Sequence, residues 1–204
     1  EKEVAKTVNS RFGVSTNSAT SALHIACLAL GLSKGDYLWT SPITFVASAN
    51  CARYCGADVD FVDIDESTGL ISIDNLKTKL EIANKKNKLP KILIPVHLTG
   101  TSCNMEEINL LSKQYGFHII EDASHAIGGR YKNEPIGNCK YSDITIFSLH
   151  PVKIITSGEG GLATTNNSSL FTKLKDLRSH GITKDQKRFQ KLSNDLWIYE
   201  QQDL

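Results

Sequence analysis

The 204-residue sequence contains no apolar run close to the roughly 20 residues that a membrane-spanning helix requires. It also lacks an excess of either charge, because 23 lysine and arginine residues stand against 22 aspartate and glutamate residues. This balance offers no bulk electrostatic attraction for nucleic acid or an anionic membrane, so we expect neither as a partner. The hydrophobic fraction of 40% and the charged fraction of 22% are those of a globular protein with a substantial core.

Cysteine pairs of the C-x-x-C type are also absent. The sequence contains five cysteines, which are Cys27, Cys51, Cys55, Cys103 and Cys139. An odd number without paired spacing is typical of reduced thiols, and we therefore expect a cytoplasmic protein. Cys51 and Cys55 are one helical turn apart, but no further ligands accompany them, so buried thiols are favoured over a metal site.

Two hydrophobic periodicities alternate along the chain. Runs typical of strands lie at Tyr37–Ser41, Val59–Asp63, Lys91–His97, Phe117–Glu121, Ser142–Ser148 and Gly161–Thr165. Helical spacing occupies Ala19–Leu30, Phe45–Tyr54, Asp74–Lys86, Met105–Tyr115 and Leu170–Arg178. This alternation predicts a three-layer α/β/α fold, in which helices cover both faces of a mostly parallel sheet. Ligands of such sheets bind beyond the carboxyl ends of the strands.

Local signals mark several helix ends. Asn104 followed by Glu107 predicts a helix start that resembles a capping box, and Gly116 stands where a helix-ending glycine is expected. Asp74 is the predicted cap of its helix, and Gly31 is the predicted end of the first helix.

The first candidate site is the segment Asn17–Leu23, where a polar loop leads into a helix of small residues. The unpaired N–H groups and partial positive charge of a helix start suit a phosphate, to which Thr20 and Ser21 could donate. A well-capped buried helix is the alternative. The sequence contains neither G-x-G-x-x-G nor a Walker A motif, so nucleotide-phosphate binding of those kinds is not supported.

The second candidate follows the predicted strand Phe117–Glu121, which leads into Asp122 and His125. These ionisable groups fall at the edge of the sheet where ligands bind. A carboxylate there can be a structural hydrogen-bond acceptor, a metal ligand or a partner for a protonated ring nitrogen. The motif alone does not decide among these uses.

The third candidate, Ser148–Gly161, is the most informative. Lys153 lies among isoleucine, valine and threonine, between Ser148 and a glycine-rich turn. Apolar surroundings disfavour the charged form of a lysine and so favour an amine nucleophile. The alternative is a lysine whose ammonium group reaches water. Together the three segments offer a phosphate seat, a carboxylate and an amine nucleophile, which is the set of groups that pyridoxal 5′-phosphate requires.

A family resemblance rests on motifs spread from about Asn9 to Gly181. In chain order they read N-S-A-T-S-A-L, S-P-I-T-F-V-A-S-A-N, P-V-H-L-T-G, E-D-A-S-H-A-I-G, S-L-H-P-V-K and G-E-G-G. The series resembles the DegT/DnrJ/EryC1/StrS family of sugar aminotransferases, which are fold-type I enzymes dependent on pyridoxal phosphate. The H-P-V-K variant is most similar to the subgroup that aminates UDP-linked 4-keto sugars on the pseudaminic acid pathway.

The resemblance implies an activity. An amino group would pass, with glutamate as donor, to a nucleotide-linked 4-keto-6-deoxy sugar for surface polysaccharide or flagellin glycan synthesis. Lys153 would form the Schiff base with the cofactor and then shuttle a proton. Asp122 would keep the pyridinium nitrogen protonated, and Phe45 would stack on the pyridine face. His150 and Glu159 lie near the lysine in sequence, but the resemblance gives them no firm role.

The remaining cofactor contacts are also implied by resemblance. Thr20 and Ser21 at the helix start would hold the cofactor phosphate together with Ser148. His125 would lie beside the ring, on the side of the cofactor's 3-oxygen. No metal ligand is implied.

Members of this family are about twice as long, so the resemblance implies that residues 1–204 are a fragment of the cofactor-binding large domain. A short N-terminal segment, a G-x-N-Y-R motif after the equivalent of Leu204 and a smaller C-terminal domain would lie outside it. The family builds its active site at a homodimer interface, so we expect this piece alone to be inactive. Trp197 and Tyr199, in the polar stretch 182–204, are then aromatic residues without their packing partners.

Three alternatives stay open from the sequence. A pyridoxal-phosphate-dependent sugar dehydratase of the same family would carry histidine in place of the lysine, and Lys153 argues against it. A regulatory relative that binds cofactor or sugar without catalysis is disfavoured, because the cofactor-facing residues are present. An unrelated nucleotide-binding α/β domain is disfavoured, because the glycine-rich phosphate loop is absent.

Overall fold

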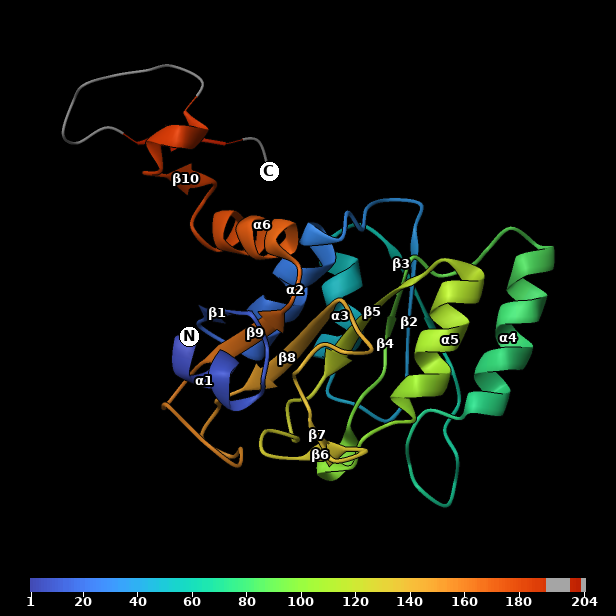
Figure 1. The fold of residues 1–204 in the computed structure, drawn as a ribbon. Coiled ribbons are helices and arrows are strands. Elements are labelled where there is room, and N and C mark those ends of the chain that lie inside the picture. The colour runs from blue at the N-terminus through green and yellow to red at the C-terminus, as the bar shows by residue number, and fades with distance from the viewer. Residues whose placement is uncertain (190–198, 203–204) are drawn as a thin grey trace.

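A seven-stranded sheet forms the centre of the protein in the computed structural model, which describes residues 1–189 and 199–202. The strand order is β1-β9-β8-β5-β4-β2-β3 (Figure 1). The strands are β1 (Phe12–Thr16), β2 (Tyr37–Thr40), β3 (Asp58–Phe61), β4 (Ile92–Ile94), β5 (His118–Asp122), β8 (Ile144–Ser148) and β9 (Gly161–Thr165). Neighbours from β3 to β8 run parallel, whereas β9 is antiparallel to both β8 and β1. The start of β9 therefore lies at the edge where the parallel strands end.

Helices connect these strands. They are α1 (Lys2–Thr7), α2 (Ala19–Ala29), α3 (Ala47–Tyr54), α4 (Ile73–Lys85), α5 (Met105–Tyr115) and α6 (Ser168–Arg178), with 3₁₀ turns η1 (Leu98–Gly100) and η2 (Gln186–Arg188). Two small ribbons pair β6 (Arg130–Tyr131) with β7 (Glu134–Pro135) and β10 (Ile182–Thr183) with β11 (Glu200–Gln201). Among residues 1–189 and 199–202, no helix has the length and apolarity needed to span a bilayer.

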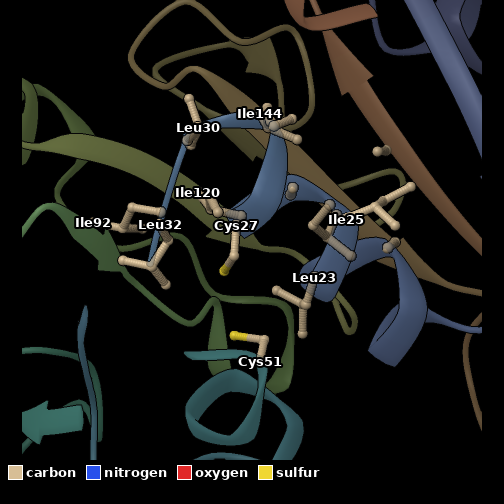
Figure 2. Packing of buried hydrophobic residues seen from close by; sticks show 14 of the residues in the cluster. Leu23, Ile25, Cys27, Leu30, Leu32, Cys51, Ile92, Ile120 and Ile144 are labelled. Carbon is tan, nitrogen blue, oxygen red and sulfur yellow. The ribbon is translucent and has the colours of Figure 1, made fainter. Parts of the chain in front are cut away.

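Buried clusters cover both faces of the sheet. Leu38 of β2 and Ile120 of β5 pack with Leu23 of α2 in one cluster, to which α3 and α6 also contribute. Figure 2 shows Leu23 and Ile120 in this cluster together with Cys51 of α3. The neighbouring residues Trp39 and Ile119 pack on the opposite face, in a cluster with α4 and α5. Successive side chains of a strand point to opposite faces, so the same two strands supply both cores. The predicted three-layer fold with a mostly parallel sheet is confirmed.

Each predicted strand and helix is present, although several ends are shifted. α3 begins at Ala47 rather than Phe45, which leaves Phe45 in the preceding loop. α1 and β1 were not predicted, because α1 has only six residues and the five-residue β1 contains a glycine. Short elements also form within 182–204, which was expected to be irregular. Tyr199 is exposed, and Trp197 lies outside the described residues.

The helix-end predictions are confirmed with one exception. Asn104 caps α5 through its side chain, and Gly116 ends that helix with φ of 79°. Gly31, with φ of 75°, follows the end of α2. The prediction that Asp74 caps α4 is wrong, because the hydroxyl of Ser72 accepts the first-turn N–H and places Asp74 inside the helix.

The start of β9 packs directly against the start of α2. A Cβ atom at Gly161 would lie 2.3 Å from the carbonyl carbon of Ser18 and 2.5 Å from the nitrogen of Ala19. Gly161 is also the antiparallel partner of Ser148, the last residue of β8. The absence of a side chain at this position therefore lets the end of β8 and the first turn of α2 come together.

We expect Gly161→Ala to lower the free energy of unfolding by about 3 kcal/mol, because backbone rather than a flexible side chain must move. Gly116→Ala is the control, since a Cβ there meets nothing within 4 Å and strains only the left-handed backbone, at a cost of about 1 kcal/mol. Urea denaturation measures both. Equal losses would show that the close approach at Gly161 is not needed.

Candidate active site

A cavity of about 530 Å³ lies at the edge of the sheet where the parallel strands end. Asp122 ends β5, Ser148 ends β8 and the first turn of α2 borders the cavity beside them. The predicted site residues line this cavity, with the exception of Ser21: they are Thr20, Phe45, Asp122, His125, Ser148 and Lys153. The fold therefore brings residues from four separate sequence segments to one place.

The carboxylate of Asp122 is buried and receives hydrogen bonds on both oxygens. The hydroxyl of Ser48 on α3 donates to Oδ2 at 2.6 Å. Ser124 donates to Oδ1 from its backbone N–H at 3.1 Å and from its hydroxyl at 2.6 Å. Because the Ser48 proton is used on Asp122, the hydroxyl of Thr44 must donate to Ser48 Oγ, 2.8 Å away. This donor set matches an ionised carboxylate.

The side chain of Lys153 meets that of His125 across the cavity. Lys153 Nζ lies 2.8 Å from His125 Nε2. Burial and the positive charge of Lys153 together lower the pKa of His125, and they outweigh the opposite effect of Asp122. The imidazole is therefore neutral at pH 7, and its Nε2 can accept a hydrogen bond from the lysine ammonium.

The first turn of α2 presents one of its two predicted hydroxyls to the cavity. Thr20 lines it together with Ser18 and Ala19. Ser21 does not, because its backbone N–H donates to the hydroxyl of Ser18 at 3.1 Å and its own hydroxyl lies 3.1 Å from the same atom. Ser18 is thus the cap of α2, and it borders the cavity where Ser21 was expected.

The surroundings of Lys153 differ from those expected. Its apolar neighbours do not enclose it, because Val152 is 78% exposed, Ile154 is 66% exposed and Ile155 is 55% exposed. Lys153 owes its placement to the loop between β8 and β9 and to its contact with His125. Of the two alternatives that the sequence left open, these exposures do not support enclosure of the lysine by its own apolar neighbours, and the lysine faces the cavity.

The remaining predicted residues also line the cavity. Phe45 is 72% exposed and lines the cavity from the loop before α3. Ser148 is buried, and its hydroxyl accepts the N–H of His150 at 3.4 Å. His150 and Glu159 also line the cavity, with His150 Nε2 and Glu159 Oε1 3.8 Å apart.

Among the described residues, no cluster of three or more His, Cys, Asp or Glu side chains is arranged to hold a metal ion.

The sequence analysis missed several residues at the site, among them Ser18, Ser48 and His97. Ser18 could have been found as the polar residue before α2, since serine is a preferred cap. Ser48 has no local signal, because its partner Asp122 is 74 residues away. His97 stands in the motif P-V-H-L-T-G, which supported the family resemblance without indicating what the imidazole does.

Residues 1–196 match the DegT/DnrJ/EryC1/StrS aminotransferase family. The chain belongs to this family. The motif-based resemblance is thereby confirmed, and the structural comparisons extend it to the fold. PseC of Helicobacter pylori, an aminotransferase involved in the biosynthesis of pseudoaminic acid, superposes with a TM-score of 0.86 at 30% identity. That alignment covers 100% of this chain and 51% of PseC.

Two further relatives of this DegT/DnrJ/EryC1/StrS chain are similar over most of its length. The UDP-4-amino-4,6-dideoxy-N-acetyl-beta-L-altrosamine transaminase of Campylobacter jejuni is 45% identical over 82% of this chain and 43% of its own. A putative sugar aminotransferase of Streptococcus pneumoniae, solved in its PMP form, has a TM-score of 0.81 and 27% identity. The alignment covers 98% of this chain and 51% of the Streptococcus pneumoniae protein. The chain spans about half the length of the relatives it matches.

We expect Ser48→Ala to lower the free energy of unfolding by about 2 kcal/mol, because a buried carboxylate loses a charge-assisted donor. Ser41→Ala is the matched control, since the Ser41 hydroxyl is buried at the same end of the sheet and has no hydrogen-bond partner within residues 1–189 and 199–202. Its removal breaks no hydrogen bond and is therefore not expected to lower the stability. Urea denaturation at pH 7 compares them, and a similar loss in both variants would contradict the role assigned to Ser48.

Proposed function

We propose that the cavity binds pyridoxal 5′-phosphate, and that the whole enzyme transfers an amino group from glutamate to a nucleotide-linked 4-keto-6-deoxy sugar. The observation that carries the proposal is the arrangement around one cavity of the Lys153 amine, the buried Asp122 carboxylate and the first turn of α2. Family membership supports the reaction class. The Campylobacter relative, by its name an altrosamine transaminase, supports the sugar class.

The residues present fit this cofactor chemically. Asp122 is held as an anion by Ser48 and Ser124, so it can pair with a protonated pyridine nitrogen. Thr20, at the start of α2, and Ser148, at the end of β8, supply hydroxyl donors for the phosphate. When bound, the cofactor would supply the electron sink that amino-group transfer requires.

Lys153 and His125 handle protons in this proposal. Lys153 Nζ is the nucleophilic atom, and it moves a proton to and from the reacting carbon. His125 Nε2 is neutral and accepts a hydrogen bond from Nζ. That bond orients the amine toward the cavity, and the exposed ring of Phe45 provides a flat apolar surface beside it.

A second subunit would complete the site. Two loops at the rim expose apolar side chains: Ile43, Phe45 and Val46 before α3, and Val152, Ile154 and Ile155 after β8. Clustered apolar residues on the rim of a cavity are typical of an interface. We therefore propose a homodimer in which this rim is covered, with the product used in surface polysaccharide or flagellin glycan synthesis.

Cofactor binding is tested by incubating the chain with pyridoxal phosphate and reducing it with borohydride. We expect a phosphopyridoxyl group on the peptide that contains Lys153, because this lysine lines the cavity. Lys153→Ala should lose the modification. Lys140→Ala should keep it, because Lys140 is exposed and precedes the start of β8, whereas the cavity lies at the end of that strand. Mass spectrometry of the digested protein identifies the modified peptide. Modification that persists unchanged in Lys153→Ala would exclude Lys153 as the attachment site.

The reaction is tested on the chain extended to the full length of its relatives. Glutamate-dependent amination of a panel of nucleotide-linked 4-keto sugars should give product, detected as consumption of glutamate and a new amino sugar. Lys153→Ala in the same background is expected to lower the rate by at least about 10³-fold, because the nucleophile and proton carrier are lost together. No turnover of any sugar in the panel would contradict the aminotransferase assignment.

A further inference from the structure

We propose that His97 and Glu121 form a positioning pair for the active site. The pair holds the loop 97–103, and this loop in turn sets the backbone of His125, so that the His125 imidazole meets Lys153. The inference rests on the proposed function for the significance of the Lys153 contact. The contact itself is measurable in the cofactor-free chain.

The pair is buried and its hydrogen bonds are complete. His97 Nε2 lies 2.7 Å from Glu121 Oε2, and both side chains are almost fully excluded from solvent. Despite burial of the ring, the Glu121 carboxylate raises the pKa of His97 above its ordinary value. The backbone N–H of Cys103 nevertheless donates to His97 Nδ1 at 3.2 Å, which leaves no room for a proton on Nδ1, so Nε2 carries the proton that is donated to Glu121. The other Glu121 oxygen accepts from Thr145 at 3.0 Å and from Ser142.

Glu121 is a carboxylate in this arrangement. Burial alone would raise the pKa of Glu121, but the donors from His97, Ser142 and Thr145 outweigh it and lower that pKa below its ordinary value. A buried charged group of this kind adds little net stability, because desolvation offsets the attraction. Its evident effect is geometric, since it fixes one orientation of the His97 ring.

The His97 ring closes the loop 97–103 from inside. The residue belongs to one end of the loop and its Nδ1 binds the backbone of Cys103 at the other end. The backbone N–H of His97 also donates to the carbonyl oxygen of Asp122 at 3.0 Å. Between these anchors, Thr99 and Gly100 both adopt left-handed backbone, with φ of 56° and 92°. A β-branched residue takes that conformation only when its surroundings impose it.

The loop meets the active site at His125. A Cβ atom at Gly100 would lie 2.9 Å from the carbonyl oxygen of His125, so the two backbones are in direct contact. The ring of His125 then reaches Lys153 at 2.8 Å. A continuous set of contacts thus runs from Glu121 through His97 and Gly100 to the His125–Lys153 pair.

The pKa of the His125 ring reports whether this contact is intact. Burial and the charge of Lys153 lower that pKa, so loss of the contact raises it. NMR titration of the ring nitrogens in the cofactor-free chain measures it, with the resonance assigned from its absence in His125→Asn. Lys153→Met removes the charge and gives the reference for a lost contact.

We expect His97→Ala to raise the His125 pKa toward the Lys153→Met value. His97→Asn should restore it in large part, because the amide oxygen can accept the N–H of Cys103 as Nδ1 does. His118→Asn is the matched control. His118 begins β5, the strand that carries Glu121 near its other end, and it pairs with Asp143 rather than with the loop, so this variant should leave the His125 pKa unchanged. An unchanged His125 pKa in folded His97→Ala would overturn the proposal.

A second variant keeps the proposal testable if His97→Ala does not fold. Gly100→Ala leaves the His97–Glu121 pair in place but puts a methyl group against the His125 carbonyl. Gly100→Ala should raise the His125 pKa, as His97→Ala does. If borohydride trapping at Lys153 fails while these pKa shifts appear, the proposed function is wrong and the positioning pair is supported. If trapping succeeds but the variants leave the His125 pKa unchanged, the positioning pair alone is wrong.

Discussion

The buried carboxylate of Asp122 is the constraint around which the site is arranged. An ionised group at 4% exposure requires donors, and here one donor is the nearby Ser124 whereas the other, Ser48, comes from a distant part of the chain. Ser48 of α3 and Ser124, in the turn that leads to His125, donate to Asp122 directly. Thr44, in the loop that carries Phe45, donates to Ser48. The hydrogen bonds around one charge therefore hold α3, this loop and the turn at the same cavity.

The arrangement of the sheet was largely predictable, because central parallel strands are buried on both faces and read as apolar runs. Ile92, Leu93 and Ile94 of β4 are all fully buried, which is why that strand was found despite its three-residue length. The edge strand β1 lacks this signal. In the described part of the chain it pairs only with β9, and its sequence alternates weakly around Gly13.

The site was predictable in composition but less so in geometry. Lys153 in an apolar segment and Asp122 after an apolar strand were candidates from the residues alone, and the family resemblance supplied their roles. Whether Ser18 or Ser21 faces the cavity depends on the rotation of α2, which is set by the burial of Leu23 and by the contact with Gly161. Such long-range packing leaves no trace in the local sequence. The same is true of Ser48, whose role exists only once α3 lies against β5.

The antiparallel setting of β9 has a consequence for how the protein can change. The loop 149–160 leaves the sheet at Ser148 and re-enters it at the partner of that residue, Gly161, so both of its ends are pinned to each other. Lys153 lies in this loop, outside the strands and helices. A substitution there alters the chemistry of the cavity without disturbing any strand pairing. The side chain that position 153 presents to the cavity and the pairing of the strands are thus separately variable, so this position can change while the sheet stays unchanged.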